Sequence, residues 1–130
     1  MAQLEQLLVD GDEVDRELVG AVLSPYIRID KSTGALIPTD AWSALSAQGQ
    51  ILVFLIAQKA RKVLGIPGER ADFMPAHIEA GTGLVGGTVR SSLNRLMKRR
   101  LVDRRKGGGY FVPNWALQRV REALIDHDEA

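Results

Sequence analysis

The sequence predicts a small, mainly helical fold of the α+β class, and three observations support this prediction. The chain has 130 residues, which is enough for one domain and too few for two ordinary ones. Its composition is 45% hydrophobic, 25% charged and only 5% aromatic, so it can bury a core, and that core should be aliphatic. Apolar residues recur at helical spacing over long segments, whereas the β-prone runs are short and flank turns that contain glycine.

The first part of the chain is expected to form two helical segments and a hairpin. Helices are predicted over 2–9 and 12–23, with a break at Asp10-Gly11-Asp12, and Val14, Leu18 and Val22 share one face of the second helix. Two β-prone runs, 26–30 and 35–38, surround a turn that ends in Gly34, and they predict a hairpin that must pack on the rest of the chain.

A long helix is predicted next. Thr39 or Asp40 can cap a short turn at 41–45, and Ser46 can cap a helix over 47–64. Gly65 and Pro67 supply the signal that ends it. Its apolar residues form a wide stripe, made by Ile51, Leu52, Leu55, Ile56 and Val63.

Shorter elements follow in close succession. After a loop at 66–72, the sequence predicts a short strand at 73–74, a helix at 75–80 that begins with proline, a glycine-rich break at 81–87 and a helix at 87–99. A second hairpin is predicted over 101–113, with Gly107–Gly109 at its tip and Pro113 at its end. Asn114 can cap a last helix that runs from Trp115 to about Asp126.

The order of elements between residues 46 and 113 resembles the winged helix-turn-helix superfamily of DNA-binding domains. The segments that carry the resemblance are PAHIEA, the turn GTGLVGG, TVRSSLNRLMKRR, LVDRR and the YFVP return. The resemblance implies a winged helix-turn-helix domain at 46–113, an acidic helical and hairpin extension at 1–45, and a C-terminal helix at 114–130. The glycine run in the turn holds more glycines than this fold usually carries.

The charge of the chain is unevenly distributed, although its formal net charge is only +1. Residues 1–40 hold eight acids and three bases, a net charge of −5, and residues 41–84 have a net charge of +1. Residues 85–106 hold eight bases and one acid, a net charge of +7, and residues 107–130 return to −2. A block of positive charge attracts a polyanion locally, although many such runs are only solvated helix faces.

The helix at 87–99 has an apolar stripe made by Val89, Leu93 and Leu96, with Met97 beside it, which must face the core. The opposite face presents short hydrogen-bonding side chains near its start and long cations further along. A helix that enters the major groove contacts base edges with such residues. The side chains expected to contact bases are Thr88, Arg90, Ser91, Asn94 and Arg95.

The hairpin at 101–113 is the candidate wing, with three consecutive cations at its tip. These can meet phosphates or enter a minor groove, although lysine and arginine also protect exposed sheet edges. The residues expected to contact the DNA backbone are Lys98, Arg99, Arg104, Arg105 and Lys106.

Other kinds of site find little support in the sequence. Absence of cysteine excludes disulfides, Cys-ligated metals and thiol chemistry. Gly81–Gly86 matches G-x-G-x-x-G, but the residues before it do not form a buried parallel strand. His77 and His127 are far apart in sequence, so no metal site, cofactor or catalytic set is expected, and a surface or capping role is expected for them. Trp42 and Trp115 are expected to be core or interface anchors.

Together these features predict a sequence-specific double-stranded DNA-binding protein, a transcriptional regulator that is not an enzyme. A single module reads few base pairs, so a homodimer is expected, with the terminal elements as its interface. No stretch is long and apolar enough for a bilayer, and the acidic N-terminus does not resemble a signal peptide, so a cytoplasmic, nucleoid-associated location is expected. The alternative is a winged-helix protein-interaction module in a replication, segregation or mobile-element complex.

Overall fold

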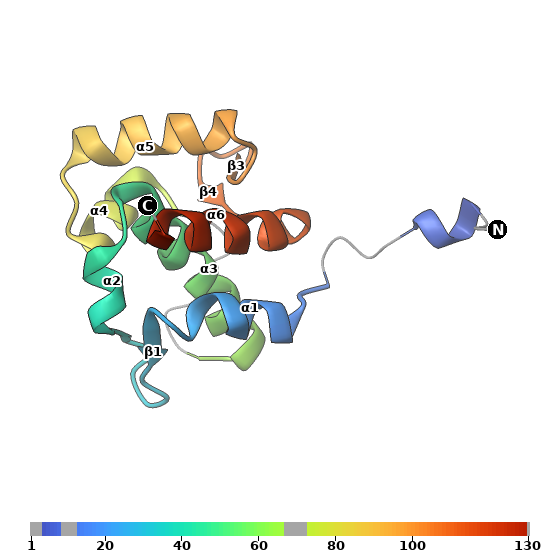
Figure 1. The fold of residues 1–130 in the computed structure, drawn as a ribbon, viewed down its shortest axis with the longest axis horizontal. Coiled ribbons are helices and arrows are strands. Elements are labelled where there is room, and N and C mark those ends of the chain that lie inside the picture. The colour runs from blue at the N-terminus through green and yellow to red at the C-terminus, as the bar shows by residue number, and fades with distance from the viewer. Residues whose placement is uncertain (1–3, 9–12, 67–72, 130) are drawn as a thin grey trace.

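The computed structural model of the chain describes residues 4–8, 13–66 and 73–129, with side chains described as far as residue 125. The described part is mainly helical, with two short antiparallel sheets of two strands each (Figure 1). The predicted break at 10–12, the signal from Pro67 and most of the loop at 66–72 lie outside the described residues. Among the described helices, none is long and apolar enough to cross a membrane.

The elements in chain order are the 3-10 helix η1 (Leu4–Leu7), α1 (Arg16–Leu23), β1 (Ile27–Ile29), β2 (Leu36–Pro38), α2 (Asp40–Ala44), α3 (Ala47–Leu64), α4 (Pro75–Thr82), α5 (Gly86–Lys98), β3 (Asp103–Arg104), β4 (Tyr110–Phe111), the 3-10 helix η2 (Asn114–Ala116) and α6 (Leu117–Glu129).

Helix α3 forms the centre of the core, and its predicted bounds are confirmed. Every residue from 51 to 58 is buried, as expected for a helix surrounded by others, and α1, α4, α5 and α6 all pack on it. The Oγ of Ser46 accepts a hydrogen bond from the backbone N–H of Gly49 at 3.1 Å and so caps the helix start. Gly65 ends the helix in the left-handed region, with φ of 66°.

Helix α1 begins later than the sequence predicts, at Arg16. Asp15 is the reason, because its Oδ1 accepts a hydrogen bond from the backbone N–H of Leu18 at 3.0 Å and caps the helix there. The predicted buried face of α1 is confirmed in part. Val19 and Val22 are buried with Leu23, whereas Val14 and Leu18 are only half-buried.

The predicted hairpin at 26–38 is confirmed as β1 and β2, which pair antiparallel with Arg28 opposite Ile37. The carboxylate of Asp30 accepts hydrogen bonds from the backbone N–H groups of Thr33 and Ser32, and these bonds hold the pKa of Asp30 below its usual value. The Nε of Arg61, on α3, donates a hydrogen bond to the carbonyl of Gly34 at 2.8 Å. The hairpin is thereby fixed to α3, which supplies the packing that an isolated hairpin needs.

The glycine-rich break between α4 and α5 is shorter than predicted. Helix α4 continues through Thr82, whose Oγ1 donates a hydrogen bond to the carbonyl of Ile78, and α5 already begins at Gly86. Gly83 ends α4 in the left-handed region, with φ of 77°. The turn between the two helices therefore contains only residues 83–85.

The second hairpin is confirmed, and the predicted strand at 73–74 joins it. Strands β3 and β4 pair antiparallel, with Arg104 opposite Tyr110. Phe73 and Tyr110 exchange two backbone hydrogen bonds, of 2.9 and 2.7 Å, and so bring the start of α4 to the hairpin.

The prediction that Asn114 caps a helix starting at Trp115 is wrong. Asn114 begins the short 3-10 helix η2, and α6 starts at Leu117. The Oδ1 of Asn114 instead accepts a hydrogen bond from Nζ of Lys59 on α3 at 2.8 Å. Neither Thr39 nor Asp40 caps α2 with its side chain. The Oγ1 of Thr39 donates a hydrogen bond to the carbonyl of Pro25 instead, and Asp40 is the first residue of the helix itself.

Candidate nucleic-acid interface

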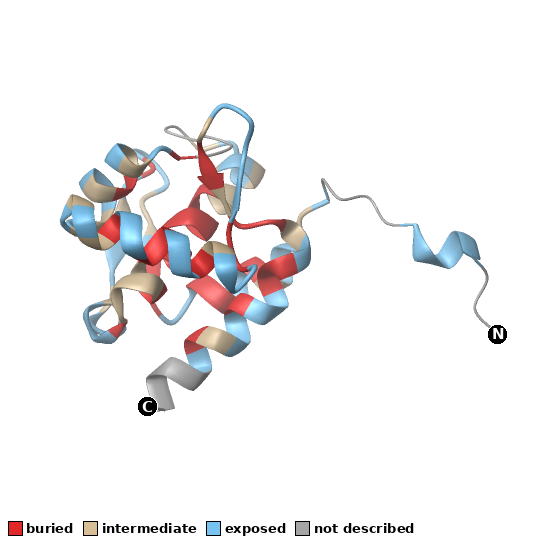
Figure 2. Ribbon diagram, turned by 90° about the horizontal axis from the view of Figure 1, so that it is seen from above, coloured by how far each residue is buried: buried red, intermediate tan, exposed pale blue. Residues whose placement is uncertain are grey.

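Helix α5 lies along one edge of the molecule, on the side opposite α1 and β1 (Figure 1). Its predicted apolar stripe is confirmed, because Val89, Leu93 and Leu96 are each no more than 1% exposed. Its other face is open to solvent, and Figure 2 shows this exposed side of the helix. The predicted outward residues are Gly87, Arg90, Ser91, Asn94, Arg95, Lys98 and Arg99, all exposed, and Thr88, which is half-buried.

Three cations on the exposed face of α5 have no partner within the described part of the chain. Arg90, Arg95 and Lys98 make no side-chain hydrogen bond or ion pair with a described residue, and neither does the amide of Asn94. The free guanidinium groups and the amide keep their hydrogen-bonding capacity for an external group. The arrangement concentrates positive charge on one helix face, where it favours an anionic partner.

Arg100 adds a further cation at the end of α5, and it does so in an unfavourable backbone conformation. Its φ of 59° makes it the only non-glycine residue with positive φ in the described chain. The backbone N–H of Leu101 bonds to the carbonyl of Leu96, and that of Arg100 to Met97, which is the hydrogen-bond pattern that ends many helices in a left-handed residue. Glycine is the usual residue at this position because it carries no Cβ. An exposed arginine with no described side-chain partner occupies it here.

We expect Arg100→Gly to be more stable than Arg100→Ala by about 1 kcal/mol, because only alanine keeps the strain of a Cβ in the left-handed region. Both variants lose the same charge, so their difference in stability reports the backbone alone. Urea unfolding of the two variants checks this expectation. Equal unfolding free energies would show that the helix end adapts to a side chain without strain.

The arginines of the β3–β4 hairpin lie on its own aromatic side chains. The guanidinium of Arg104 lies 5.3 Å from the ring centroid of Tyr110, and its Nε donates a hydrogen bond to the carbonyl of Gly108. The guanidinium of Arg105 lies 4.2 Å from the ring centroid of Phe111. Such contacts hold a cation near a ring while its edge still faces solvent. Lys106, at the exposed tip, makes no side-chain contact with a described residue.

Arg99 differs from the other predicted backbone contacts. Its Nη1 donates a hydrogen bond to Oε1 of Gln48 at 2.8 Å, and its carbonyl accepts one from Arg119 of α6 at 3.1 Å. It therefore joins the end of α5 to α3 and α6. Of the five residues predicted to touch a DNA backbone, Lys98 and Lys106 are free, whereas the others already have contacts within the described chain.

Different structural constraints explain why glycine occupies most of its positions in and around the turn between α4 and α5. A Cβ on Gly81 would overlap the ring of Phe54 on α3, so α4 packs there at glycine distance. Gly83 has positive φ, and a Cβ on Gly86 would lie 2.6 Å from Oε1 of Glu79. Gly87 has neither constraint, since a Cβ there would meet nothing within 4 Å. It is exposed at the start of α5, beside the outward cations.

Lys59 is a residue near the hairpin that the sequence did not single out. Its ammonium is half-buried, and its hydrogen bond to Asn114 joins two residues that are 55 positions apart in sequence. Burial, and then the nearby charges of Arg105 and Lys62, lower the pKa of Lys59 to about 8. No local sequence pattern predicts the contact between Lys59 and Asn114, because it forms only when η2 packs against α3.

We expect Lys59 to lose its proton near pH 8, and folding stability to rise as a result. Between pH 8 and the ordinary lysine pKa of about 10.4, the unfolded chain binds more protons at this site than the folded chain, so the free energy of unfolding increases with pH. NMR titration of the lysine side chains measures the pKa directly. The pH slope of stability should be smaller in Lys59→Met, and a Lys59 pKa above 10 would contradict the expectation.

The described residues offer no group of three metal-ligating side chains. His77 caps α4, since its Nδ1 accepts a hydrogen bond from the backbone N–H of Met74 at 3.2 Å, and the side chain of His127 lies outside the described residues. The G-x-G-x-x-G run joins two helices. Trp42 is half-buried against the core, whereas Trp115 is 64% exposed and is therefore not a core residue.

Comparison with known proteins gave no match to a family model, to a curated protein or to a solved structure. Function therefore has to be inferred from the geometry and charge of this chain.

Proposed function

We propose that the protein binds double-stranded DNA in a sequence-specific manner and acts as a transcriptional regulator, with a winged helix-turn-helix domain at 46–113. The observation that carries the proposal is the exposed face of α5, where the side chains of Arg90, Asn94 and Arg95 have no partner among the described residues. Arginine can donate two hydrogen bonds to guanine, and asparagine can make two with adenine. The same face therefore combines general attraction to DNA with groups that distinguish bases.

The dimensions of α5 suit the major groove. Its 13 residues correspond to a length of about 20 Å, and a helix with side chains fits a groove about 12 Å wide. Its first residues, Gly86 to Thr88, are small, so the start of the helix can approach base edges closely. The apolar stripe that faces α3 fixes which side of α5 is presented.

The hairpin and the end of α5 supply the phosphate contacts in this proposal. Lys98 and Arg100 lie at the C-terminal end of α5, and Figure 1 shows β3 and β4 beside the same end. Lys106 extends from the hairpin tip, and the stacked Arg104 and Arg105 are held close to the strands. These contacts position the domain and add affinity, whereas the face of α5 provides the specificity.

Selection from a pool of random duplex DNA tests the proposal. The native chain should enrich one motif, and a variant with Asn94→Ala should lose its preference at the adenine that this residue contacts. If the expected homodimer forms, the motif should contain two inverted half-sites. Recovery of random sequences after several rounds, at an affinity no higher than for an unselected duplex, would contradict specific recognition.

A protein-interaction module is the second candidate function, and exposed apolar side chains favour it. Trp115 is 64% exposed and Met74 is 41% exposed, and Met74 lies beside Gly108 of the hairpin. Tryptophan is enriched in the energetically important parts of protein interfaces. Complex formation with a defined acidic protein that is lost in Trp115→Ser, together with no binding to any duplex, would favour this function over DNA recognition.

A further inference from the structure

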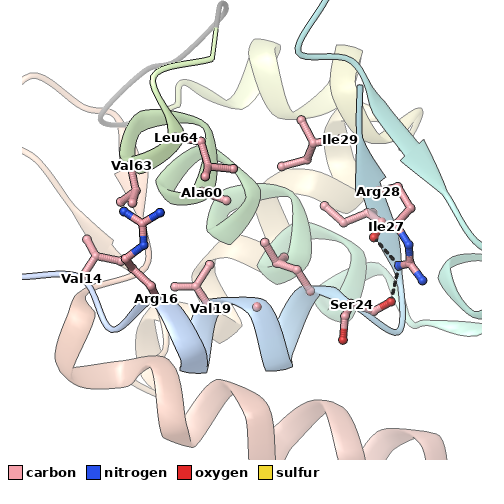
Figure 3. A pocket seen from close by; sticks show the side chains of 12 residues that line it. Val14, Arg16, Val19, Ser24, Ile27, Arg28, Ile29, Ala60, Val63 and Leu64 are labelled. Atoms are coloured by element: carbon pink, nitrogen blue, oxygen red, sulfur yellow. Dashed lines mark hydrogen bonds between the residues drawn. The ribbon is translucent and has the colours of Figure 1, made fainter. Parts of the chain in front are cut away.

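A groove about 410 Å³ in volume lies between α1, β1 and the C-terminal end of α3. Figure 3 shows its lining, which is apolar at its centre, with Val19 and Leu23 from α1, Ile27 and Ile29 from β1, and Ala60 and Val63 from α3. It lies on the side of the molecule away from α5, so DNA bound at α5 would leave it open (Figure 1). Its volume is in the range of pockets that hold ligands, about 300–1,000 Å³.

The segment Leu4–Leu8, here called the arm, carries three leucines that no other described residue covers. Leu4, Leu7 and Leu8 are 80%, 73% and 79% exposed, the highest values among the large apolar side chains of the described residues. Residues i and i+3 of a 3-10 helix lie on the same side, so η1 places Leu4 and Leu7 together, with Leu8 next to them. Figure 1 shows the arm extended away from the body of the molecule, beyond the start of α1.

The charges of the arm and the groove are complementary. The only charged side chain of the arm is Glu5, and no basic side chain occurs before residue 16. The rim of the groove carries Arg16 and Arg28, whereas none of the described residues that line it is acidic. Arg16 has no side-chain partner among the described residues and can meet a carboxylate.

We propose that the arm of one copy occupies the groove of a second copy, and that the two copies exchange arms to form the homodimer. Five residues separate Leu8 from Val14, which lies at the edge of the chain's own groove, so the six steps of the connection can span about 20 Å at most. That reach is enough to cross to a neighbouring groove that faces it. The three leucines are exposed rather than seated in the groove of their own chain, which favours the groove of a second copy. Burial of three leucines supplies the apolar driving force.

The absence of cysteine allows a direct test by cross-linking. Equal amounts of Leu7→Cys and Gly20→Cys chains are mixed and oxidised without DNA. Gly20 lines the groove, and a Cβ there would meet no neighbouring atom within 4 Å. We expect a disulfide-linked dimer that contains one chain of each kind, whereas a mixture of Leu7→Cys and Ile37→Cys, on the exposed side of β2, should give none. A double variant, Leu7→Cys with Gly20→Cys, that closes a bond within one chain at high dilution would overturn the proposal.

Solution mass provides the second measurement. The native chain and Gly20→Ala should have twice the chain mass. Gly20→Trp, whose side chain fills the groove, should have the mass of one chain. The unfolding temperature of Gly20→Trp should be unchanged or raised, because helices favour residues other than glycine. Arg16→Glu should weaken the dimer at least 10-fold, and adding Glu5→Arg should restore it. A dimer that persists in Gly20→Trp, or a native chain that is monomeric at all concentrations, would overturn the proposal. These measurements do not involve DNA, so arm exchange and DNA recognition can fail independently.

Discussion

Replacement of Arg90, Asn94 and Arg95 together with alanine is expected to weaken binding to the selected duplex by at least about 100-fold. Each paired contact to a base contributes about 1–3 kcal/mol of discrimination, and about 1.4 kcal/mol corresponds to a tenfold change in affinity. The three side chains are exposed and make no side-chain hydrogen bond or ion pair with a described residue, and alanine favours helices. The variant should therefore unfold at the native temperature or slightly above it. Titration of a labelled duplex, with thermal unfolding in parallel, measures both quantities.

A variant matched in charge provides the control for this experiment. Lys31→Ala with Arg121→Ala removes two exposed cations from the β1–β2 turn and from α6, and it should bind the duplex within about threefold of the native affinity, because surface charges far from the interface act weakly at physiological salt. Equal losses in the control and in the α5 variant would mean that only net charge matters. If the α5 variant binds the duplex with native affinity, α5 is not part of the DNA-binding surface.

Replacement of Gly81 by alanine is expected to lower the free energy of unfolding by about 3 kcal/mol, the upper range for a forced overlap in a packed core. The added Cβ would overlap the ring of Phe54, which is 5% exposed and cannot swing into solvent. Either the ring, which lies edge-on to Phe73 at 5.1 Å, or the whole of α4, which packs on α3, must move. Urea unfolding of the native and variant chains measures the loss.

Gly87→Ala is the matched control, because it adds the same methyl group in the same turn region. Nothing lies within 4 Å of that Cβ, and φ of Gly87 is not positive, so the better helix propensity of alanine should raise stability by about 0.5 kcal/mol. In a Phe54→Ala background, Gly81→Ala should lose most of its effect, because the overlapping ring is gone. Similar losses in the two glycine variants would show that the overlap with Phe54 is not the cause.

The sequence predicted the elements best where each boundary has a local chemical signal. Ser46 and Gly65 mark the two ends of α3, Pro75 marks the start of α4, and both ends were predicted correctly for α3. The apolar stripe of α5 could likewise be assigned from its spacing, because one face of a helix must be buried in a domain of this size.

The start of α1 was missed although its signal is local: Asp15 lies inside the predicted helix at 12–23, yet its bond to Leu18 caps α1, and the helix begins four residues later than predicted. Features that depend on tertiary contacts could not be predicted from the sequence. The stacking of Arg105 on Phe111 and the bond from Lys59 to Asn114 join residues whose contact depends on the folded hairpin and η2. The glycines of the turn look alike in sequence, whereas the structure gives each a different role.

The candidate interface also contains one residue that the charge count did not distinguish from the others. Arg100 was one of eight bases in the segment 85–106, and only its positive φ shows that a cation replaces the favoured glycine there. The groove between α1, β1 and α3 could not be predicted from the sequence either, because its walls come from three separate parts of the chain. Both features follow from how the elements pack.

The salt dependence of binding to the selected duplex tests most directly whether the α5 and hairpin surface binds DNA. The proposed surface carries five cations at the end of α5 and on the hairpin, and the proposal gives each of them one phosphate: Lys98, Arg100, Arg104, Arg105 and Lys106. Each phosphate contact contributes about −0.9 to the slope of log affinity against log salt, so the affinity per protomer should fall about 500-fold between 50 and 200 mM salt. Arg100→Gly with Lys106→Ala should reduce that slope by about two contacts. A native affinity that changes less than about threefold over this range would contradict DNA binding by this surface.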